Sequence, residues 1–235
     1  MKKNGFTLAE VLITLAIIGV VATMTLPALM SNTAEQQAKS ALKKGINTLT
    51  EAAATAQAID GVDYATITAM GTTNTAEPNL NTFYGILTSR TKVDFTNTLN
   101  ASVGTDETDA INTQDTTMDS VVFLQDGSAI LYNSSVDLEE ALASSWDGLP
   151  QGIVIVYDTN GVRQPNILSN CTGDRTGADA DADYGDDRYG TTPPGDLPAS
   201  TCTNNMRVIR DQFKLRLRGT QVVPEGDAAV WAYNS

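Results

Sequence analysis

The side chains most suited to chemistry form a short acidic run, Asp179, Asp181 and Asp183. Carboxylates spaced two positions apart are typical of the first half of an EF-hand-type calcium loop, where they supply hard oxygen ligands. The rest of that pattern is missing, because Tyr184 stands where such a loop needs glycine and Gly190 where it needs glutamate. Two interpretations stay open, a calcium site and a solvated acidic loop.

The chain contains no histidine, which excludes a Ser-His-Asp or Cys-His nucleophile and every zinc site that needs imidazole. Its two cysteines, Cys171 and Cys202, bracket the acidic run and lie 31 positions apart. An even pair of cysteines in an exported region is typical of a disulfide, which loop closure makes worth roughly 3 to 4 kcal/mol. We therefore expect an acidic insertion closed by a disulfide, and we expect no enzymatic activity.

Basic residues gather near the C-terminal end, at Arg207, Arg210, Lys214, Arg216 and Arg218. In a strand the last three would share one face, and the apolar residues between them would take the other. We expect the charged face to be the solvent side of a half-buried strand, and contact with the acidic loop of a neighbouring copy stays open. Nucleic acid binding is disfavoured, because acids outnumber bases 28 to 15 and no aromatic residues alternate with these cations.

The N-terminal region is apolar over a length that suits a membrane. From Val11 to Ala34 there is no charged side chain, and roughly 20 apolar residues cross the hydrocarbon core of a bilayer. Lys2 and Lys3 precede this run, so the positive-inside rule predicts a cytoplasmic N-terminal end and an exported remainder. An ordinary signal peptide and an uncleaved single-pass anchor would share these features.

Glu10, at the start of the apolar run, favours a third interpretation. A carboxylate carried into a bilayer costs on the order of 2.5 to 3.5 kcal/mol on insertion scales, so it needs a cationic partner. A plain signal sequence has no use for such a residue.

The basic leader followed by Gly5, Phe6 and Glu10 resembles the N-terminus of type IV pilins and of the pseudopilins of type II secretion systems. The resemblance implies that a prepilin peptidase cuts between Gly5 and Phe6 and methylates the new amino group. It also implies that Glu10 neutralises the Phe6 amino group of a neighbouring subunit in a filament. Gly19 and Pro27 occupy the positions of the glycine and proline that this family tends to have in its apolar helix, where both residues weaken helical structure.

A second resemblance covers the C-terminal third. Many pilin-like proteins carry an Asp-x-Asn-Gly segment after a strand, then Pro-Asn, and later Asp-x-Phe before a short strand. The matching residues here are Asp158, Asn160, Gly161, Pro165, Asn166, Asp211 and Phe213, followed by Gly219 and Pro224. The chain departs from that pattern by an insertion of over forty residues between Asn166 and Asp211. For Asp158 and Asn160 we favour a role in a turn over a role as ligands.

The elements that must position these residues begin with one helix, expected from about Thr7 to Ile59 and ended by Asp60-Gly61. An apolar stripe marks its second half, with Lys39, Lys43, Lys44 and Glu51 largely off it. The stripe is Ala34, Ala38, Leu42, Ile46, Leu49, Ala53, Ala56 and Ile59. Strands are expected as a hairpin around Asp126-Gly127, as a buried run over 152–157, and as a pair over 212–219 and 220–223. Short helices are expected within 83–89 and 137–145.

The expected fold class is α+β: a long N-terminal helix, with a membrane-spanning half and an amphipathic half, packed on a small antiparallel sheet as in pilins. The expected divisions are a leader at 1–5, a transmembrane and filament-core helix at 6–30 and its amphipathic continuation at 31–59. An irregular connection at 60–119 leads to a sheet domain at 120–235, which carries the acidic insertion at 171–202.

The resemblance implies a structural subunit of a type IV pilus-like filament or a type II secretion pseudopilus. Its partners would be other copies or related pilin subunits, prepilin peptidase, the inner-membrane assembly platform, and lipid before assembly. It would cross the inner membrane once with its globular domain exported, and end in a periplasmic pseudopilus or an extracellular pilus. The alternative is a membrane-anchored exported binding module, an adhesin or calcium-dependent receptor, that does not polymerise.

Overall fold

The protein is described in a computed structural model that defines residues 8–71, 79–98, 118–143, 151–161, 163, 168–171 and 207–235. The helices are α1 (Leu8–Asp60), α2 (Phe83–Arg90), α3 (Leu138–Ala141) and α4 (Asp227–Asn234). The strands are β1 (Val93–Thr98), β2 (Ser120–Leu124), β3 (Ala129–Tyr132), β4 (Ile153–Asp158), β5 (Asn170–Cys171), β6 (Arg207–Val208), β7 (Gln212–Arg218) and β8 (Gln221–Pro224). The chain forms two compact units, Met1–Gln37 and Ala38–Ser235, and α1 contributes residues to each.

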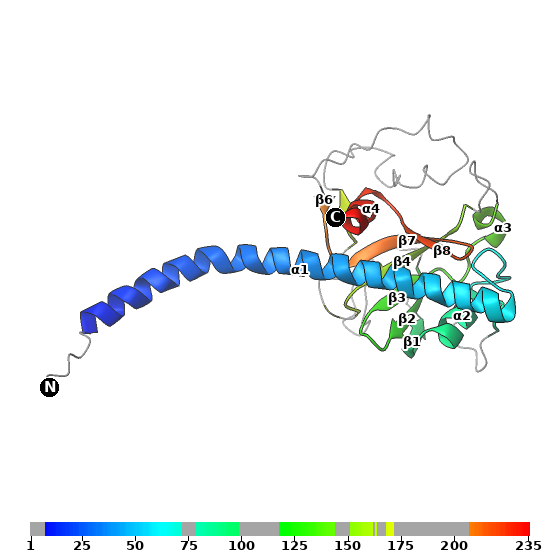
Figure 1. The fold of residues 1–235 in the computed structure, drawn as a ribbon, viewed down its shortest axis with the longest axis horizontal. Helices are drawn as coiled ribbons and strands as arrows, with labels where there is room; N and C mark the ends of the chain where they lie inside the picture. Colours follow the sequence, from blue (N-terminus) through cyan, green and yellow to red (C-terminus); the bar gives the residue numbers. More distant parts are fainter. Residues whose placement is uncertain are drawn as a thin grey trace, which may run out of the picture. The chain divides into compact units, whose positions relative to one another are not determined.

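The second unit is built on a six-stranded antiparallel sheet in the order β1-β2-β3-β4-β7-β8 (Figure 1). Its first hairpin turns at Asp126-Gly127, as predicted, with Phe123 of β2 opposite Ala129 of β3. Gly127 has a φ of 88°, a conformation that glycine adopts without steric cost. A long N-terminal helix with a small antiparallel sheet confirms the expected α+β class.

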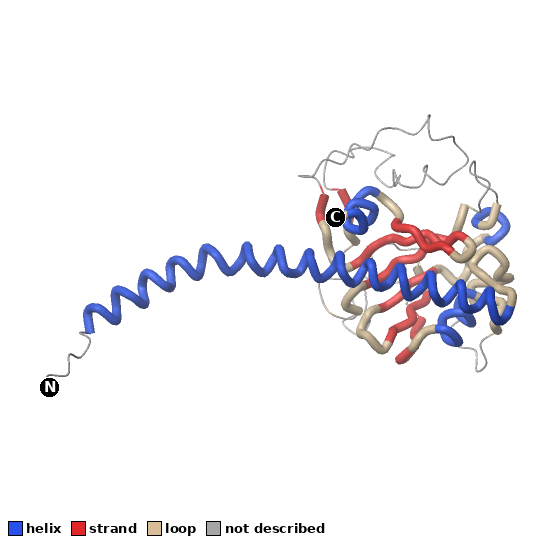
Figure 2. Tube along the Cα trace, in the orientation of Figure 1, coloured by secondary structure: helices blue, strands red, loops and turns tan. Residues whose placement is uncertain are grey.

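From Ala38 onward, α1 packs along one face of the sheet, where Figure 2 shows the helix crossing the strands. Six residues of the predicted apolar stripe are buried there: Ala38, Leu42, Ile46, Leu49, Ala53 and Ala56. Phe213, Leu215 and Leu217 of β7 face the same core, which confirms the predicted alternation of that strand. The two ends of the stripe differ from the prediction, because Ala34 is exposed and Ile59 is 66% exposed.

The helix α1 ends at Asp60, where the sequence predicts a stop. Gly61 has a φ of 72°, and its N–H donates to the carbonyl of Gln57 at 3.1 Å. A residue in the left-handed conformation after the last turn is a common way to end a helix. Arg90 of α2 forms an ion pair with Asp60 at this end.

Part of the stretch expected to be irregular, residues 60–119, is regular in the structure. The helix α2 matches the short helix predicted there and is capped by Thr82, whose hydroxyl accepts the N–H of Gly85 at 3.0 Å. Strand β1 was not predicted, because its Val-Asp-Phe-Thr-Asn-Thr sequence carries little apolar signal. Its strand conformation depends on pairing with β2, which lies more than twenty positions further along the chain.

The prediction of a solvated charged face on β7 is wrong for its arginines. Arg216 and Arg218 are each only 5% exposed. Arg216 forms a two-point ion pair with Glu225, from Nε to Oε2 at 2.8 Å and from Nη2 to Oε1 at 2.7 Å. Its Nη1 also donates to the carbonyl of Gln151 at 3.2 Å. Residues next to β4 and β8 therefore cover this face, which strand periodicity alone does not reveal.

The two-residue strands β5 and β6 pair outside the main sheet, with Cys171 opposite Arg207 and Asn170 opposite Val208. We call this pair the β5–β6 stem, because the insertion leaves the sheet domain at β5 and returns at β6. The helix α4 packs against the stem and against β7 and β8. Neither the stem nor α4 was predicted, since two-residue strands and an eight-residue helix carry little periodic signal.

Candidate functional site

The first unit of the chain is dominated by the apolar beginning of α1. Within the described residues, Leu8–Thr25 is long and apolar enough to cross a membrane by length and composition. At 1.5 Å per residue this stretch spans about 27 Å, close to the hydrocarbon thickness of a bilayer. None of it is buried inside the structure, and its large apolar side chains are 46% to 78% exposed. Such a surface suits lipid or the apolar surface of other helices rather than water.

Three threonines in this stretch form side-chain hydrogen bonds to backbone carbonyls of the same helix. The hydroxyls of Thr14 and Thr23 donate to the carbonyls three residues earlier, each at 2.9 Å, and Thr25 donates to the carbonyl of Val21 at 3.0 Å. A hydroxyl satisfied in this way costs little when it is removed from water. Apart from Glu10, the stretch Leu8–Thr25 is thus compatible with an apolar environment.

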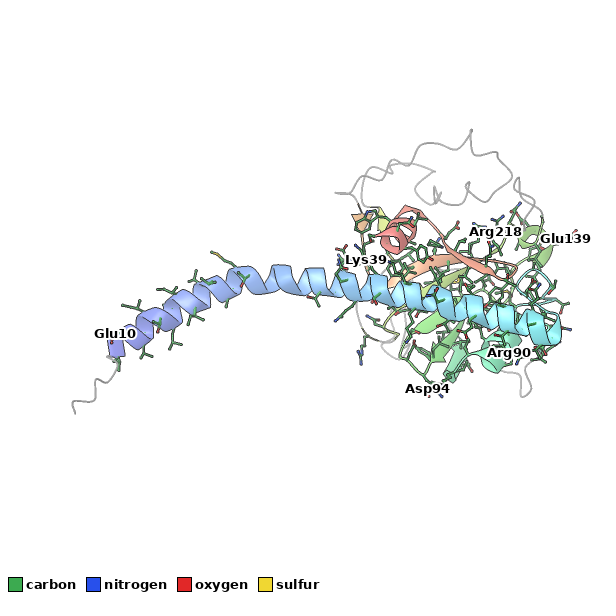
Figure 3. The ribbon with its side chains drawn as sticks, viewed as in Figure 1. Glu10, Lys39, Arg90, Asp94, Glu139 and Arg218 are labelled. Carbon is green, nitrogen blue, oxygen red and sulfur yellow. The ribbon has the colours of Figure 1, made fainter. Side chains whose placement is uncertain are left out.

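Glu10 is the acidic residue of the first turn of α1, near the N-terminal end of the helix (Figure 3). A carboxylate there is favoured by the positive end of the helix dipole, which lowers the cost of keeping it charged. Gly5 and Phe6, the predicted cleavage residues, lie outside the described part of the chain.

The helix α1 continues without interruption through Gly19 and Pro27. A Cβ added to Gly19 would meet nothing within 4 Å, so contacts within the described structure do not explain a glycine there. Glycine in an exposed helix interior is unfavourable by about 1 kcal/mol relative to alanine. The side chain of Pro27 lies outside the described residues.

The motif residues of the C-terminal third meet where β4 ends and β7 begins. Asp158 is fully buried, and its Oδ1 accepts the N–H groups of Asn160 at 3.0 Å and Gly161 at 2.7 Å. Its Oδ2 accepts Nε2 of Gln212 at 2.9 Å. Burial raises the pKa of Asp158 to about 7, although these hydrogen bonds oppose the shift and Asp211 adds to it.

Asp211, which precedes β7, forms hydrogen bonds with the same turn. Its backbone carbonyl accepts the N–H of Thr159 at 2.8 Å and the Thr159 hydroxyl at 2.9 Å. Its Oδ2 accepts Nδ2 of Asn160 at 3.2 Å. Gly161 has a φ of 65°, and a Cβ there would lie 2.6 Å from the Gly127 carbonyl of the first hairpin. These contacts account for the motif as a structural turn that joins three strands.

The structure thus brings together four of the predicted motif residues, Asp158, Asn160, Gly161 and Asp211, while Phe213 lies in the core beneath α1. Pro165 and Asn166 lie outside the described residues, as do Cys202 and the candidate calcium ligands Asp179, Asp181 and Asp183. Cys171 lies in β5. Elsewhere, in the residues that are described, no group of three or more His, Cys, Asp or Glu side chains is placed to hold a metal ion. The disulfide and the calcium site stay predictions.

Lys39 shows what the sequence pattern missed. It was expected largely off the apolar stripe, yet this residue, labelled in Figure 3, is 6% exposed. Its ammonium lies 3.8 Å from the centre of the Trp231 ring in α4. The contact joins residues 192 positions apart, so no local pattern could have indicated it. The buried partner of Arg216, Glu225, was missed for a related reason, since it lies across a turn, immediately after the next strand.

Comparison with known proteins gave one match. Residues 1–26 match the prokaryotic N-terminal methylation motif. No curated protein and no solved structure matched the chain significantly. The matched segment contains the predicted cleavage residues Gly5 and Phe6, the acidic residue Glu10 and the whole exposed apolar stretch Leu8–Thr25. The chain therefore carries at its N-terminus the prepilin-type signal of type IV pilins and pseudopilins.

Proposed function

We propose that the protein is a structural subunit of a type IV pilus-like filament or a type II secretion pseudopilus. The observation that carries this proposal is an apolar helix, Leu8–Thr25, that is exposed on all faces and begins with Glu10 directly after a methylation motif. A globular domain built around a buried core does not need such a helix for its own stability. The helix is suited first to lipid and then to the helices of other subunits.

Processing in this proposal takes place between Gly5 and Phe6. Prepilin peptidase removes the basic leader and methylates the new amino group of Phe6, which stays cationic. The amine of one subunit then pairs with Glu10 of a neighbouring subunit within the filament. A buried carboxylate needs such a partner, because a single unpaired charge among apolar helices is strongly destabilising.

Gly19 and Pro27 serve assembly rather than the fold of the single subunit. The open space around Gly19 leaves room for the backbone of a neighbouring helix, as small residues do where helices pack in membranes. Pro27 lacks a backbone donor, so α1 can bend or unwind there when subunits pack. The precursor crosses the inner membrane once, meets the assembly platform there, and ends in a periplasmic pseudopilus or an extracellular pilus.

Mass spectrometry of the mature protein tests the processing step. An N-terminus at Phe6 carrying one added methyl group is the expected result. An intact Met1, or a mature start near Glu35, would contradict the proposal and support an anchored or secreted binding module instead.

A substitution at Glu10 tests assembly separately from processing. Glu10→Gln keeps the size of the side chain and removes its charge, so the Phe6 amine loses its counter-charge. We expect the yield of sheared filaments to fall at least about tenfold, while the subunit is still cleaved and methylated. Glu51→Gln, on the exposed side of the same helix, is the matched control and should assemble normally. Normal assembly of Glu10→Gln would refute the pairing.

A further inference from the structure

The helix α4 is fastened to α1 by two lysines of α1. The Lys39 ammonium lies 3.8 Å from the centre of the Trp231 ring, and Nζ of Lys43 donates to the backbone carbonyl of Ser235 at 2.8 Å. Both lysines belong to the first turns of α1 in the second unit. The helix α4 also packs against the β5–β6 stem, and β6 lies beside it in Figure 1. One short helix therefore contacts both the beginning of the packed part of α1 and the base of the insertion.

The chain before α4 is firmly held. Glu225 is 4% exposed and forms the two-point ion pair with Arg216. Its N–H also donates to the carbonyl of Lys214 at 2.9 Å. These contacts fix the end of β8 to β7, so movement of α4 must begin after this residue.

Gly226 follows immediately and connects the fixed residue to α4. Its φ of 80° and ψ of 156° are open to glycine and unfavourable for other residues. The N-terminus of α4 has no side-chain capping hydrogen bond, and the helix is eight residues long. Helices of this length are marginal on their own, so α4 depends on the contacts that hold it in place. The fixed Glu225, the flexible Gly226 and the marginally stable helix α4 together have the features of a hinge.

The chemistry of Lys39 is compatible with a reversible release of α4. Opening of α4 would uncover its buried alanines Ala228, Ala229 and Ala232, and the hydrophobic effect opposes this over the small area of three alanine side chains. Lys39 has a long flexible stem, and its ammonium can reach water if Trp231 moves away. While Trp231 is in place, the face of the indole ring attracts the same ammonium. Both the closed and the open arrangement therefore satisfy the charge.

We propose that α4 is a hinged strap that fastens residues 38–46 of α1 to the β5–β6 stem, and that it opens about Gly226 as one cooperative unit. The strap couples the insertion to the helix that leaves the globular domain. A change at the stem loosens the start of the packed helix, and loosening of that helix frees the stem. This coupling depends on contacts within the second unit and not on the proposed filament.

Hydrogen exchange on the full-length protein in detergent micelles tests the strap. Lys39→Met keeps the length of the stem and removes the charge that holds Trp231. We expect amide exchange to rise about tenfold, and by a common factor, in α4, in residues 38–46 and in β5–β6. Exchange in the central strands β2 and β3 should stay unchanged. Lys44→Met is the matched control within the same segment of α1, because it removes an exposed ion pair with Asp126 instead of the contact with Trp231; it should raise exchange in none of the three segments.

A second variant separates the charge from the shape of the side chain. Lys39→Arg retains a cation that can stack on Trp231, so it should restore exchange to near the wild-type rate in all three segments. Three results would overturn the proposal: no change in Lys39→Met, a rise confined to one segment, or an equal rise in β2 and β3. The last would mean that the substitution destabilises the whole domain rather than opening a strap.

Discussion

At the scale of single residues, the most unusual feature of the C-terminal motif is a buried carboxylate, that of Asp158. Asp158 has no exposed surface and is held by two backbone N–H groups and the amide of Gln212. These donors hold the turn in place, but removal from water still penalises the charged form. The residue therefore makes the fold sensitive to pH in a range where ordinary aspartates are fully ionised.

The direction of this pH dependence follows from the pKa of Asp158, which is about 7 in the folded protein and 3.8 in its ordinary state. Between pH 4 and pH 7 the folded protein holds one proton that the unfolded chain has lost. This residue therefore makes the free energy of unfolding fall as pH rises, by about 4 kcal/mol in all. Urea denaturation of the full-length protein between pH 4.5 and pH 8 should show this loss, whereas Asp158→Asn should be flatter by about 1.4 kcal/mol per pH unit.

Asp126→Asn is the control for this titration. Partial burial opposes ionisation of Asp126, but hydrogen bonds from Lys44 and Ser128 prevail and lower its pKa below 3.8. Its contribution is present above that ordinary value and is lost only as pH falls through its lowered pKa. The slope between pH 5 and pH 7 should therefore match the wild type. A wild-type slope in Asp158→Asn would show that another group titrates.

The buried ion pair between Arg216 and Glu225 gives a second test at this scale. Each residue is about 5% exposed or less, so removal of one partner leaves a buried charge without its counter-charge. We expect Glu225→Gln and Arg216→Met each to cost roughly 3 to 5 kcal/mol, and the double variant to cost far less than the sum. Urea denaturation of all four proteins measures the coupling. Additive costs would contradict it.

The exposed pair of Lys44 and Asp126 provides the comparison. Its lysine side chain is 61% exposed, so solvent screens the interaction. The same set of variants there should give a coupling below about 1 kcal/mol.

At the scale of elements, the two glycines of α1, Gly19 and Gly45, differ in how closely other atoms approach them. A Cβ on Gly45 would lie 2.4 Å from the buried ring of Tyr157 in β4, so the close approach of helix and sheet requires its absence. A Cβ on Gly19 would meet nothing. The first glycine serves the fold of the subunit, and in our proposal the second serves packing between subunits.

Alanine substitutions separate these two reasons. Alanine favours a helix over glycine by about 1 kcal/mol, but at Gly45 the overlap with Tyr157 should outweigh this and leave a net loss of about 1 to 3 kcal/mol. Gly19→Ala should leave the denaturation midpoint of the globular domain unchanged. If Gly19 admits a neighbouring helix, this second variant should instead reduce filament yield. Unchanged stability of Gly45→Ala would mean that helix and sheet can separate at little cost.

At the scale of the whole molecule, the second unit carries an insertion whose ends are joined by the short β5–β6 stem. A disulfide between Cys171 and Cys202 would add a covalent link to the pairing of β5 with β6. We predict that the exported protein contains no reactive thiol until it is reduced, as measured by alkylation and mass spectrometry. Reduction should then lower the free energy of unfolding by roughly 2 to 4 kcal/mol. Alkylation of both cysteines without reduction would refute the disulfide.

The acidic run within the insertion has a separate test. If Asp179, Asp181 and Asp183 bind calcium, a chelator should lower the melting temperature and added calcium should restore it, because a ligand that binds only the folded state stabilises it. Asp181→Asn should weaken this response. A melting temperature that changes with neither chelator nor calcium would contradict the calcium site and favour a solvated acidic loop.

Local sequence was sufficient for the features that depend on neighbours along the chain. The apolar helix, its acidic start, its end at Gly61, the hairpin at Gly127 and the alternation of β7 all follow from periodicity and turn chemistry. The N-terminal signal is likewise a short contiguous segment, and this is why it is identifiable in a chain that has no overall match.

The tertiary structure alone decided the contacts between distant residues. Burial of Lys39 under Trp231, the pairing of Arg216 with Glu225 and the strand conformation of Val93–Thr98 depend on which elements become neighbours in the fold. A row of charged residues on one face of a strand predicts a solvated face. Whether another segment covers that face depends on residues distant in the sequence. The sequence therefore determined how this protein begins and which local elements it forms, whereas the packing of those elements decided which of its charges are buried.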